Sequence, residues 1–424
     1  MEARRRLSFL YPHQAKLFPL LGQISRALRG IVMIFLVIRT LPPVEYGSYD
    51  LLLGLIALSA AFSVGLLAQG TIRFVSFYRD NPTTQRAVLE LVFALTLLAG
   101  FLAGTLVWLL RPWIASWLRF PAFLDWAWLL ALTVLLQGLR GLALHTLQGQ
   151  ERYGRLLSVE LVLNGGFVFG VLLLWRGNVL GLSSLLWIFL ATEAASLLVS
   201  WLLARPWLPS RPRWHAEHFR AFWSFSGYLA LYMLALHGGQ YADVILISAY
   251  LSPEQVGFYS AVKRLTDTIA LVFLNAINTV TLPRSAYLYQ RRDWPGLRRL
   301  KRRALGYGLL LLGPAGMACM LAPEAILEAL YRGAYTASAP ILRTLGAGFP
   351  AEVFYLVGLN LLMGIGHVAP VFRAQLMRLG LSTTLYLILI PAWGERGAAM
   401  ANVLAASAAA LYVQWMLYRI WTGR

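Results

Sequence analysis

Arginines inside long apolar segments are the residues of this 424-residue chain best suited to chemistry. Arg26 and Arg29 lie in the middle of the first such segment, three residues apart, so a helix would place them on one face. An ionised side chain at mid-bilayer depth costs about 2.5–3.5 kcal/mol on insertion scales, so such residues usually face a cavity or a partner. Because the guanidinium fork matches phosphate oxygens, the pattern predicts a site for a phosphate-bearing anion.

Basic residues at similar depth occur in both halves of the chain. The predicted cationic cavity is lined by Arg26, Arg29, Arg140, Arg264 and Arg378. The alternative is internal pairing that fixes helix positions, for instance of Lys263 or Arg264 with Asp243 or Asp267. Lys263 and Asp267 are four residues apart, and for them we favour the structural interpretation.

Acidic residues inside the apolar segments are candidates for coupling transport to an ion gradient. They are Asp243, Glu160, Glu193 and Glu352. A proton-coupled carrier needs a carboxylate whose protonation changes with its access to water. Each could equally be an ion-pair partner or lie near an interface. For His237, beside two glycines, we favour hydrogen-bonded packing over a proton relay.

The sequence predicts neither a catalytic residue nor a resident metal. Cys319 is the only cysteine, which excludes an intrachain disulfide and a cysteine-cluster metal site. No connector between apolar segments exceeds about 20 residues, so an enzyme of glycan assembly would lack an extramembrane reaction site. We therefore expect a protein that is not an enzyme and needs no cofactor. Coupling to a proton or sodium gradient, or to the membrane potential, stays open.

Composition places these residues in a membrane protein. Apolar residues make up 59% of the chain and charged residues 13%, against about 25% charged in soluble domains. Apolar windows of about 20 residues recur, each long enough to cross the hydrocarbon core as a helix. The predicted spans are 17–39, 50–70, 87–110, 124–147, 156–175, 180–203, 222–248, 256–282, 304–322, 339–366, 370–390 and 397–420. The fold class is thus an all-α polytopic membrane protein of about twelve helices, without a cleaved signal peptide.

The net charge of +19 lies mainly in alternate connectors, of which 283–303 is the most basic. The positive-inside rule then places both termini in the cytoplasm, and nucleic acid is not needed to explain the charge. A second interpretation of 283–303 is an amphipathic helix that rests on the anionic inner leaflet and gathers lipid phosphates. Both interpretations can hold together.

The two halves of the chain resemble each other. The segment Leu41-Pro-Pro-Val-Glu-Tyr-Gly-Ser-Tyr49 recurs as Leu251-Ser-Pro-Glu-Gln-Val-Gly-Phe-Tyr259, with its Gly-x-Tyr element 210 residues later. Three weaker echoes, at Pro112, Leu147-Gln-Gly149 and Gly181, follow at offsets up to 216. The repeat predicts two six-helix lobes, 1–210 and 211–424, in one orientation, with a site at their interface.

The sequence resembles the polysaccharide-biosynthesis flippases, also known as lipid-linked oligosaccharide or O-antigen flippases, of the multidrug/oligosaccharidyl-lipid/polysaccharide exporter (MOP) superfamily. The motifs that carry the resemblance are the segment 41–49, Asp243-Val-Ile-Leu-Ile247 with the following 252–265, Leu282-Pro283, and 330–342. They extend over nearly the whole chain but are mostly structural. They therefore indicate the superfamily better than the substrate.

The resemblance implies a MATE-like, V-shaped pair of lobes around a central cationic cavity, working by alternating access. The implied cargo is an undecaprenyl-pyrophosphate-linked oligosaccharide moved from the cytoplasmic to the periplasmic leaflet of the inner membrane. Membrane lipids, and a glycan polymerase or ligase, would be its partners. Twelve spans leave out the extra helix pair of the lipid II flippase branch.

Other functions remain open on the same scaffold. A drug or cation antiporter would need acids to outnumber bases in the cavity, which the sequence does not favour. A lipid II-type peptidoglycan precursor flippase is a close variant of the leading hypothesis. A membrane enzyme of glycan assembly is a third hypothesis, which the short connectors disfavour, and a lipid scaffold that uses the same cavity without transport is a fourth.

Overall fold

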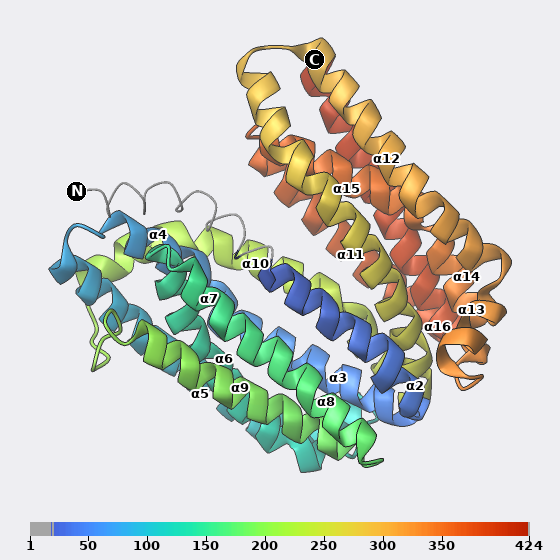
Figure 1. Cartoon of the computed structure of the whole chain (residues 1–424), viewed down its shortest axis with the longest axis horizontal. Helices are drawn as coiled ribbons and strands as arrows, with labels where there is room; N and C mark the ends of the chain where they lie inside the picture. Colours follow the sequence, from blue (N-terminus) through green and yellow to red (C-terminus); the bar gives the residue numbers. More distant parts are fainter. Residues whose placement is uncertain (1–17, 19–20, 423–424) are drawn as a thin grey trace. The chain divides into compact units, whose positions relative to one another are not determined.

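The computed structural model describes residue 18 and residues 21–422, without the side chains of 63–64, 228–233, 236–237, 271–276 and 278–280. Within these residues every regular element is a helix and none is a strand (Figure 1), which confirms the all-α prediction. The basic residues before position 17 lie outside the described residues.

The chain forms two compact units. The first consists of the residues up to Val37 together with Leu52–His237, and the second of Ile38–Leu51 together with the residues from Gly238 onward. The chain therefore passes between units at three points: between Val37 and Ile38, inside α3 (Pro43–Ala60) and inside α10 (Ala216–Tyr250). The predicted division into lobes at residue 210 stays a prediction.

The first unit is built around α5, α6, α9 and α4, which pack on one another. Asn81 caps α5 by accepting a hydrogen bond from the Thr84 backbone N–H at 3.3 Å, and Pro82 follows where its missing N–H costs nothing. Its elements are η1 (Met33–Val37), η2 (Ala61–Gly65), α4 (Leu66–Phe77), α5 (Pro82–Trp117), α6 (Phe123–Gly149), α7 (Tyr153–Glu160), η3 (Leu161–Gly165), α8 (Gly166–Arg176) and α9 (Leu182–Ala204).

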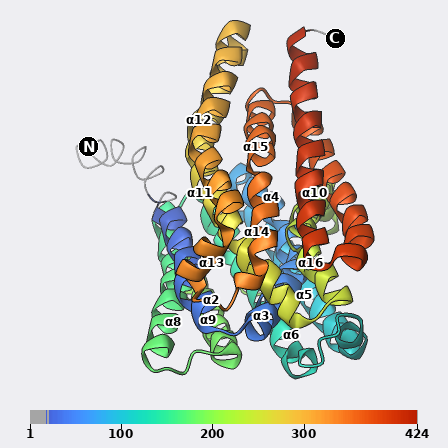
Figure 2. The same ribbon diagram turned by 90° about the vertical axis from the view of Figure 1, so that its right-hand side faces the viewer.

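The second unit combines the short α2 (Ile38–Thr40) and the start of α3 with the C-terminal helices. Ser252 and Gln255 form a capping box at the start of α11, with Pro253 in the first turn. Its further elements are α11 (Pro253–Gln290), α12 (Trp294–Leu321), α13 (Pro323–Tyr331), η4 (Thr336–Ser338), α14 (Ala339–Ala347), α15 (Phe349–Gly364) and α16 (Val368–Thr422). Figure 2 shows α11 and α12 as long neighbouring helices and α15 between α12 and α16.

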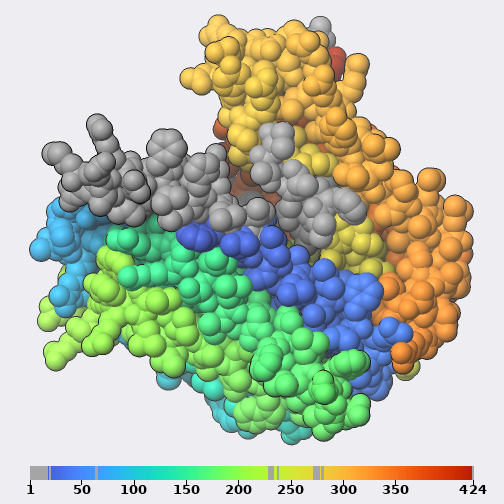
Figure 3. Space-filling model, in the orientation of Figure 1, coloured from blue at the N-terminus to red at the C-terminus, as the bar shows by residue number. Residues whose placement is uncertain are grey.

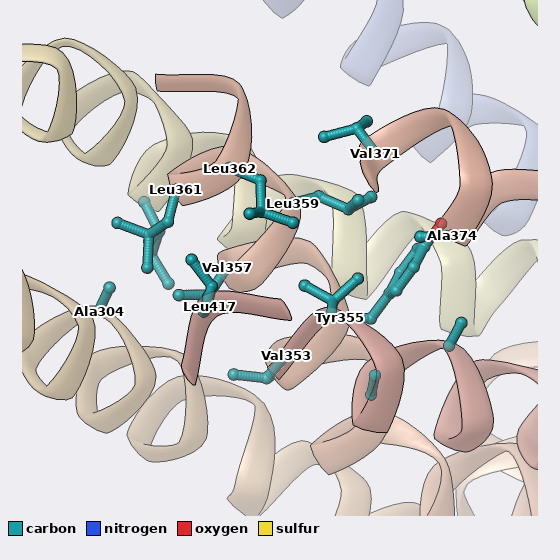
Figure 4. Packing of buried hydrophobic residues seen from close by; sticks show 14 of the residues in the cluster. Ala304, Val353, Tyr355, Val357, Leu359, Leu361, Leu362, Val371, Ala374 and Leu417 are labelled. Carbon is teal, nitrogen blue, oxygen red and sulfur yellow. The ribbon is translucent and has the colours of Figure 1, made fainter. Parts of the chain in front are cut away.

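The core of the second unit lies between α11, α12, α15 and α16. Figure 4 shows apolar side chains from these helices interdigitating, among them Ala304, Val353, Leu361 and Leu417. Since Val353, Leu361 and Leu417 are fully buried, burying each contributes about 1.5–3 kcal/mol. This packing fixes the helices that carry the charged residues described below.

The predicted spans coincide with helices except at residues 180, 181, 322, 348, 365 and 366, and residues 17, 19 and 20 of the first span lie outside the described residues. Among the described residues, seven helices are long and apolar enough to cross a membrane, and an eighth candidate is the bent pair Thr336–Ala347 and Phe349–Gly364. α16 has 55 residues. At about 1.5 Å per residue its length is more than twice the thickness of a hydrocarbon core, so we assign two spans to it. They meet at Gly394, whose φ of 59° and ψ of −141° are not helical.

The sequence repeat reappears as repeated packing. At Gly149 an added Cβ would lie 2.8 Å from Val75 Cβ and 3.0 Å from Ile72 O. At its counterpart Gly364 the added Cβ would meet Ser285 Oγ and Leu282 O. In each unit a glycine near a helix C-terminus thus lets another helix approach closely, at positions separated by nearly the repeat offset.

Candidate functional site

Lys263 and Asp243 form an ion pair at the centre of a buried polar cluster in the second unit. Lys263 Nζ lies 2.5 Å from Asp243 Oδ2 and also donates to the backbone oxygen of Gln240 at 2.9 Å. Tyr259, one helical turn before Lys263 on α11, donates its hydroxyl to Asp243 Oδ2 at 2.9 Å. With 1% of its side chain exposed, Asp243 is therefore satisfied by an ammonium, a hydroxyl and a backbone N–H.

Arg264, the next residue of α11, pairs with Asp50 of α3. Arg264 Nη2 donates to Asp50 Oδ1 at 2.8 Å, and the carboxylate is 7% exposed while the arginine is 33% exposed. Asp50 belongs to the short stretch Ile38–Leu51 that packs in the second unit. The pair therefore joins residues 214 positions apart within one unit.

Two glycines explain how α3 and α11 come close enough for this pair. An added Cβ at Gly47 would lie 2.0 Å from Pro253 O, and one at Gly257 would lie 1.9 Å from Pro43 O. The contact is reciprocal, because each glycine faces the backbone carbonyl that opens the other helix. These glycines belong to the two copies of the sequence repeat, so the repeated motif is a helix-crossing motif.

A tyrosine outside the spans ties the same region together. The Tyr335 hydroxyl donates to the backbone oxygen of Leu41 at 3.1 Å, and its ring meets that of Tyr331 edge-on. Burial raises the pKa of the Tyr335 hydroxyl well above its usual range, so the group stays a donor. Leu41 immediately precedes the crossing of α3 and α11.

A third ion pair of this unit joins α15 and α16. Arg378 uses both terminal nitrogens on Glu352, with Nη1 to Oε2 at 3.0 Å and Nη2 to Oε1. The Arg378 guanidinium carbon also lies 4.9 Å from the ring centre of Tyr355, and Asn402 Oδ1 accepts at 3.5 Å. Such a bidentate pair is strong and geometrically specific.

The first unit holds Arg26 and Arg29 on the Leu21–Thr40 span. Arg26 Nη1 lies 3.4 Å from Glu160 Oε1, and the arginine side chain is 57% exposed. Asn164 Nδ2 holds the other Glu160 oxygen at 3.0 Å. Arg29 instead places its guanidinium carbon 4.2 Å above the ring of Phe167. Arg26 is thus loosely paired, and Arg29 is held by a cation–π contact.

Arg140 is paired more tightly. Its Nε donates to Glu193 Oε2 at 2.9 Å, and Gln137 Nε2 donates to Glu193 Oε1 at 3.0 Å. Glu193 is 3% exposed and Arg140 17% exposed. This group links α6 to α9 inside the first unit and is the most enclosed of its charged pairs.

The structure thus brings the predicted arginines and the predicted acids together. Four of the five predicted cavity arginines pair with a carboxylate, and three of those carboxylates are predicted coupling residues, while Asp243 pairs with Lys263. Arg29 alone of the five has no carboxylate within 4 Å among the described residues. The roles of these residues in substrate binding and ion coupling stay predictions.

Sequence reasoning missed Asp50 as the partner of Arg264. Asp50 lies at the edge of a predicted span. Its position about one helical turn after Gly47 of the repeated motif was the feature of the sequence that could have identified it. Of the pairings that the sequence left open for Lys263, the structure shows the one with Asp243, whereas Asp267 is exposed and forms no ion pair in the described part of the chain. The side chain of His237 lies outside the described residues. Across those that are described, no three His, Cys, Asp or Glu side chains group as metal ligands.

Comparison with known proteins identifies the fold and family. Residues 36–340 match the family model described as polysaccharide biosynthesis protein. An uncharacterized membrane protein of Methanocaldococcus jannaschii is 22% identical over 411 residues, which cover 90% of this chain and 78% of that protein. A probable low-salt glycan biosynthesis flippase of Haloferax volcanii is 23% identical over 282 residues, 66% of this chain and 58% of the relative.

Solved structures share the fold. A lipid II flippase in an inward closed conformation aligns with a TM-score of 0.73 and 15% identity over 97% of this chain and 87% of its own. An inward-facing multidrug resistance MATE family transporter of the MOP superfamily aligns with a TM-score of 0.70 and 16% identity over 94% of both chains. The polytopic MOP-like fold predicted from the sequence is confirmed.

Proposed function

Since this chain belongs to the polysaccharide biosynthesis protein family, we propose that it flips an anionic lipid-linked glycan across the membrane. The coarser part of this function follows from family and fold: the chain is a multi-pass membrane protein of the transporter type. The finer part is that the cargo is an undecaprenyl-pyrophosphate-linked oligosaccharide. It would move from the cytoplasmic to the periplasmic leaflet of the inner membrane by alternating access.

The observation that carries the proposal is the pair of arginines on the Leu21–Thr40 span. Arg29 has no acidic partner among the described residues, and Arg26 is more than half exposed with an ion pair of 3.4 Å. Exposed ion pairs contribute only about 0–1 kcal/mol. A diphosphate that offers several oxygens to two neighbouring guanidinium groups can therefore displace Glu160 from Arg26 at little cost.

The same exchange supplies a place for ion coupling. When a phosphate takes over Arg26, Glu160 keeps only the hydrogen bond from Asn164 Nδ2. The carboxylate then becomes the group of this site that can take up a proton, and it returns to Arg26 after the substrate leaves. Among the four acids predicted from the sequence, we therefore favour Glu160, because Glu193 and Asp243 are almost fully buried in their pairs.

The test is translocation of a fluorescent polyprenyl-pyrophosphate oligosaccharide in proteoliposomes. We expect Arg26→Ala and Arg29→Ala to reduce the initial rate at least tenfold while expression and membrane insertion stay normal. Arg73→Ala is the matched control, because Arg73 is also exposed and lies 3.9 Å from the ring centre of Phe225. Normal rates for both Arg26→Ala and Arg29→Ala would refute the phosphate site.

A cation antiporter is the second candidate, favoured by Asp267. This carboxylate is exposed in the middle of α11 and forms no ion pair among the described residues. Uptake of a fluorescent organic cation against a proton gradient that is lost in Asp267→Asn would support it.

Competition of the labelled oligosaccharide with unlabelled lipid II would likewise distinguish the two flippase substrates.

A further inference from the structure

The turn between α11 and α12 presents an unusual number of unpaired basic side chains. Seven exposed arginines lie here, and none has a carboxylate within 4 Å among the described residues. They are Arg284, Arg291, Arg292, Arg298, Arg299, Arg302 and Arg303. The turn and the first half of α12 form the upper end of the surface in Figure 3.

The turn holds these side chains on a fixed backbone. Arg292 takes a left-handed conformation with φ of 56° and closes α11 by donating its N–H to Tyr289 O at 2.9 Å. Asp293 then caps α12, because its Oδ1 accepts from the Gly296 N–H at 2.7 Å. The arginines of α12 therefore start from a rigid helix end, and Asp293 is occupied by its cap.

Four of the arginines form two parallel rows on one face of α12. Arg298 lies above Arg302, and Arg299 above Arg303, each pair four residues apart. Like charges at this spacing destabilise a helix, because their side chains are neighbours. The opposite face of this stretch is buried in the core through Leu297 and Ala304, so the arginines cannot turn inward. Such a face is stable where anions lie between the rows.

The row of Arg299 and Arg303 continues along α12 as exposed apolar side chains. The next residues on this face are Tyr307, Leu310, Met317 and Leu321, whose exposed fractions are 60%, 68%, 59% and 81%. From Arg303 to Leu321 the helix rises about 27 Å, close to the thickness of a hydrocarbon core. One face therefore changes from cationic to apolar, and its apolar part is about as long as a hydrocarbon core is thick.

We propose that this face of α12 is a binding site for an anionic phospholipid of the surrounding leaflet. Arg299 and Arg303 take its phosphate, and Tyr307, Leu310 and Met317 lie along its acyl chains. A topological role alone requires only a count of basic residues, whereas this face also has matched rows and a continuous apolar extension. The site is independent of the proposed transport function and of the Arg26 and Arg29 pair.

The test is native mass spectrometry of the full chain in detergent, titrated with phosphatidylglycerol and with phosphatidylcholine. We expect phosphatidylglycerol to bind at least tenfold more tightly. At about 1 kcal/mol per basic residue, R299Q/R303Q should lower the affinity for phosphatidylglycerol roughly 30-fold. The single variant R303Q should lower this affinity about fivefold. It tests the site even if the double variant does not fold.

R205Q/R211Q is the matched control, because it removes two exposed arginines from a connector that carries no apolar row. It should leave the affinity for phosphatidylglycerol within twofold of the unchanged protein. Equal losses in R299Q/R303Q and R205Q/R211Q would overturn the site in favour of net charge. Equal competition by inorganic phosphate and by phosphatidylglycerol would overturn the role of the acyl chains.

Discussion

The closest approach between helices in the second unit makes Gly257→Ala the sharpest structural test. The new Cβ would lie 1.9 Å from Pro43 O and 2.7 Å from Pro43 C. Non-bonded heavy atoms normally lie about 3.5–4.0 Å apart, so α3 and α11 would have to separate by roughly 1.5 Å. Neither side of the contact is a flexible side chain, so no rotamer change relieves it.

The magnitude follows from two opposing effects. Overpacking of a tight contact costs about 1–3 kcal/mol, and we expect the upper end because two helix backbones must move. Alanine gains up to about 1 kcal/mol over glycine in a helix. The net loss should be about 2 kcal/mol in the free energy of unfolding, measured by equilibrium denaturation in mixed micelles. Gly47→Ala should cost a similar amount, since its Cβ would meet Pro253 O at 2.0 Å.

Gly306→Ala on α12 is the control, because a Cβ there meets nothing within 4 Å. It should be neutral or stabilising by up to about 1 kcal/mol. The double variant of Gly47 and Gly257 should cost less than the sum of the single variants, because one separation of the helices accommodates both methyl groups. Equal stability of Gly257→Ala and Gly306→Ala would refute the reasoning.

Further variants test the contacts next to this crossing. Arg264→Ala should destabilise the protein by about 2 kcal/mol, since it leaves the Asp50 carboxylate buried and unpaired; the double variant with Asp50→Ala should regain most of this loss in the same denaturation assay. Tyr335→Phe removes the hydrogen bond to Leu41 O and should cost about 1 kcal/mol, seen as a lower unfolding midpoint, and an unchanged midpoint would contradict that contact.

The helices could be predicted because their signal is local. A run of about 20 apolar residues is sufficient to indicate a span, and capping residues such as Asn81 and Ser252 indicate where helices begin. The break at Gly394 lies in the predicted connector 391–396, whereas the 42° bend between α14 and α15 lies inside the single predicted span 339–366 and could not be located.

The candidate site could be predicted only as a set of residues. Depth in an apolar segment identified the charged side chains, but not which of them meet. Arg378 and Glu352 were assigned different roles, although one is the bidentate partner of the other. Asp50 and Arg264 are 214 residues apart, and no local pattern encodes such a contact. Pairing is a property of the packed helices, so the sequence leaves it open.

The repeat separates packing from chemistry. Gly47 and Gly257 are equivalent in the two halves, and each is required by the same close approach. The charges beside them are not repeated: at the same offset, Gly54 stands opposite Arg264 and Ser260 opposite Asp50. Helix crossing therefore accounts for what the halves share. The Arg264–Asp50 pair has no equivalent in the first half of the sequence, so it makes the two halves chemically different. We therefore expect the residues that bind a substrate with one charged end to lie where the two halves differ.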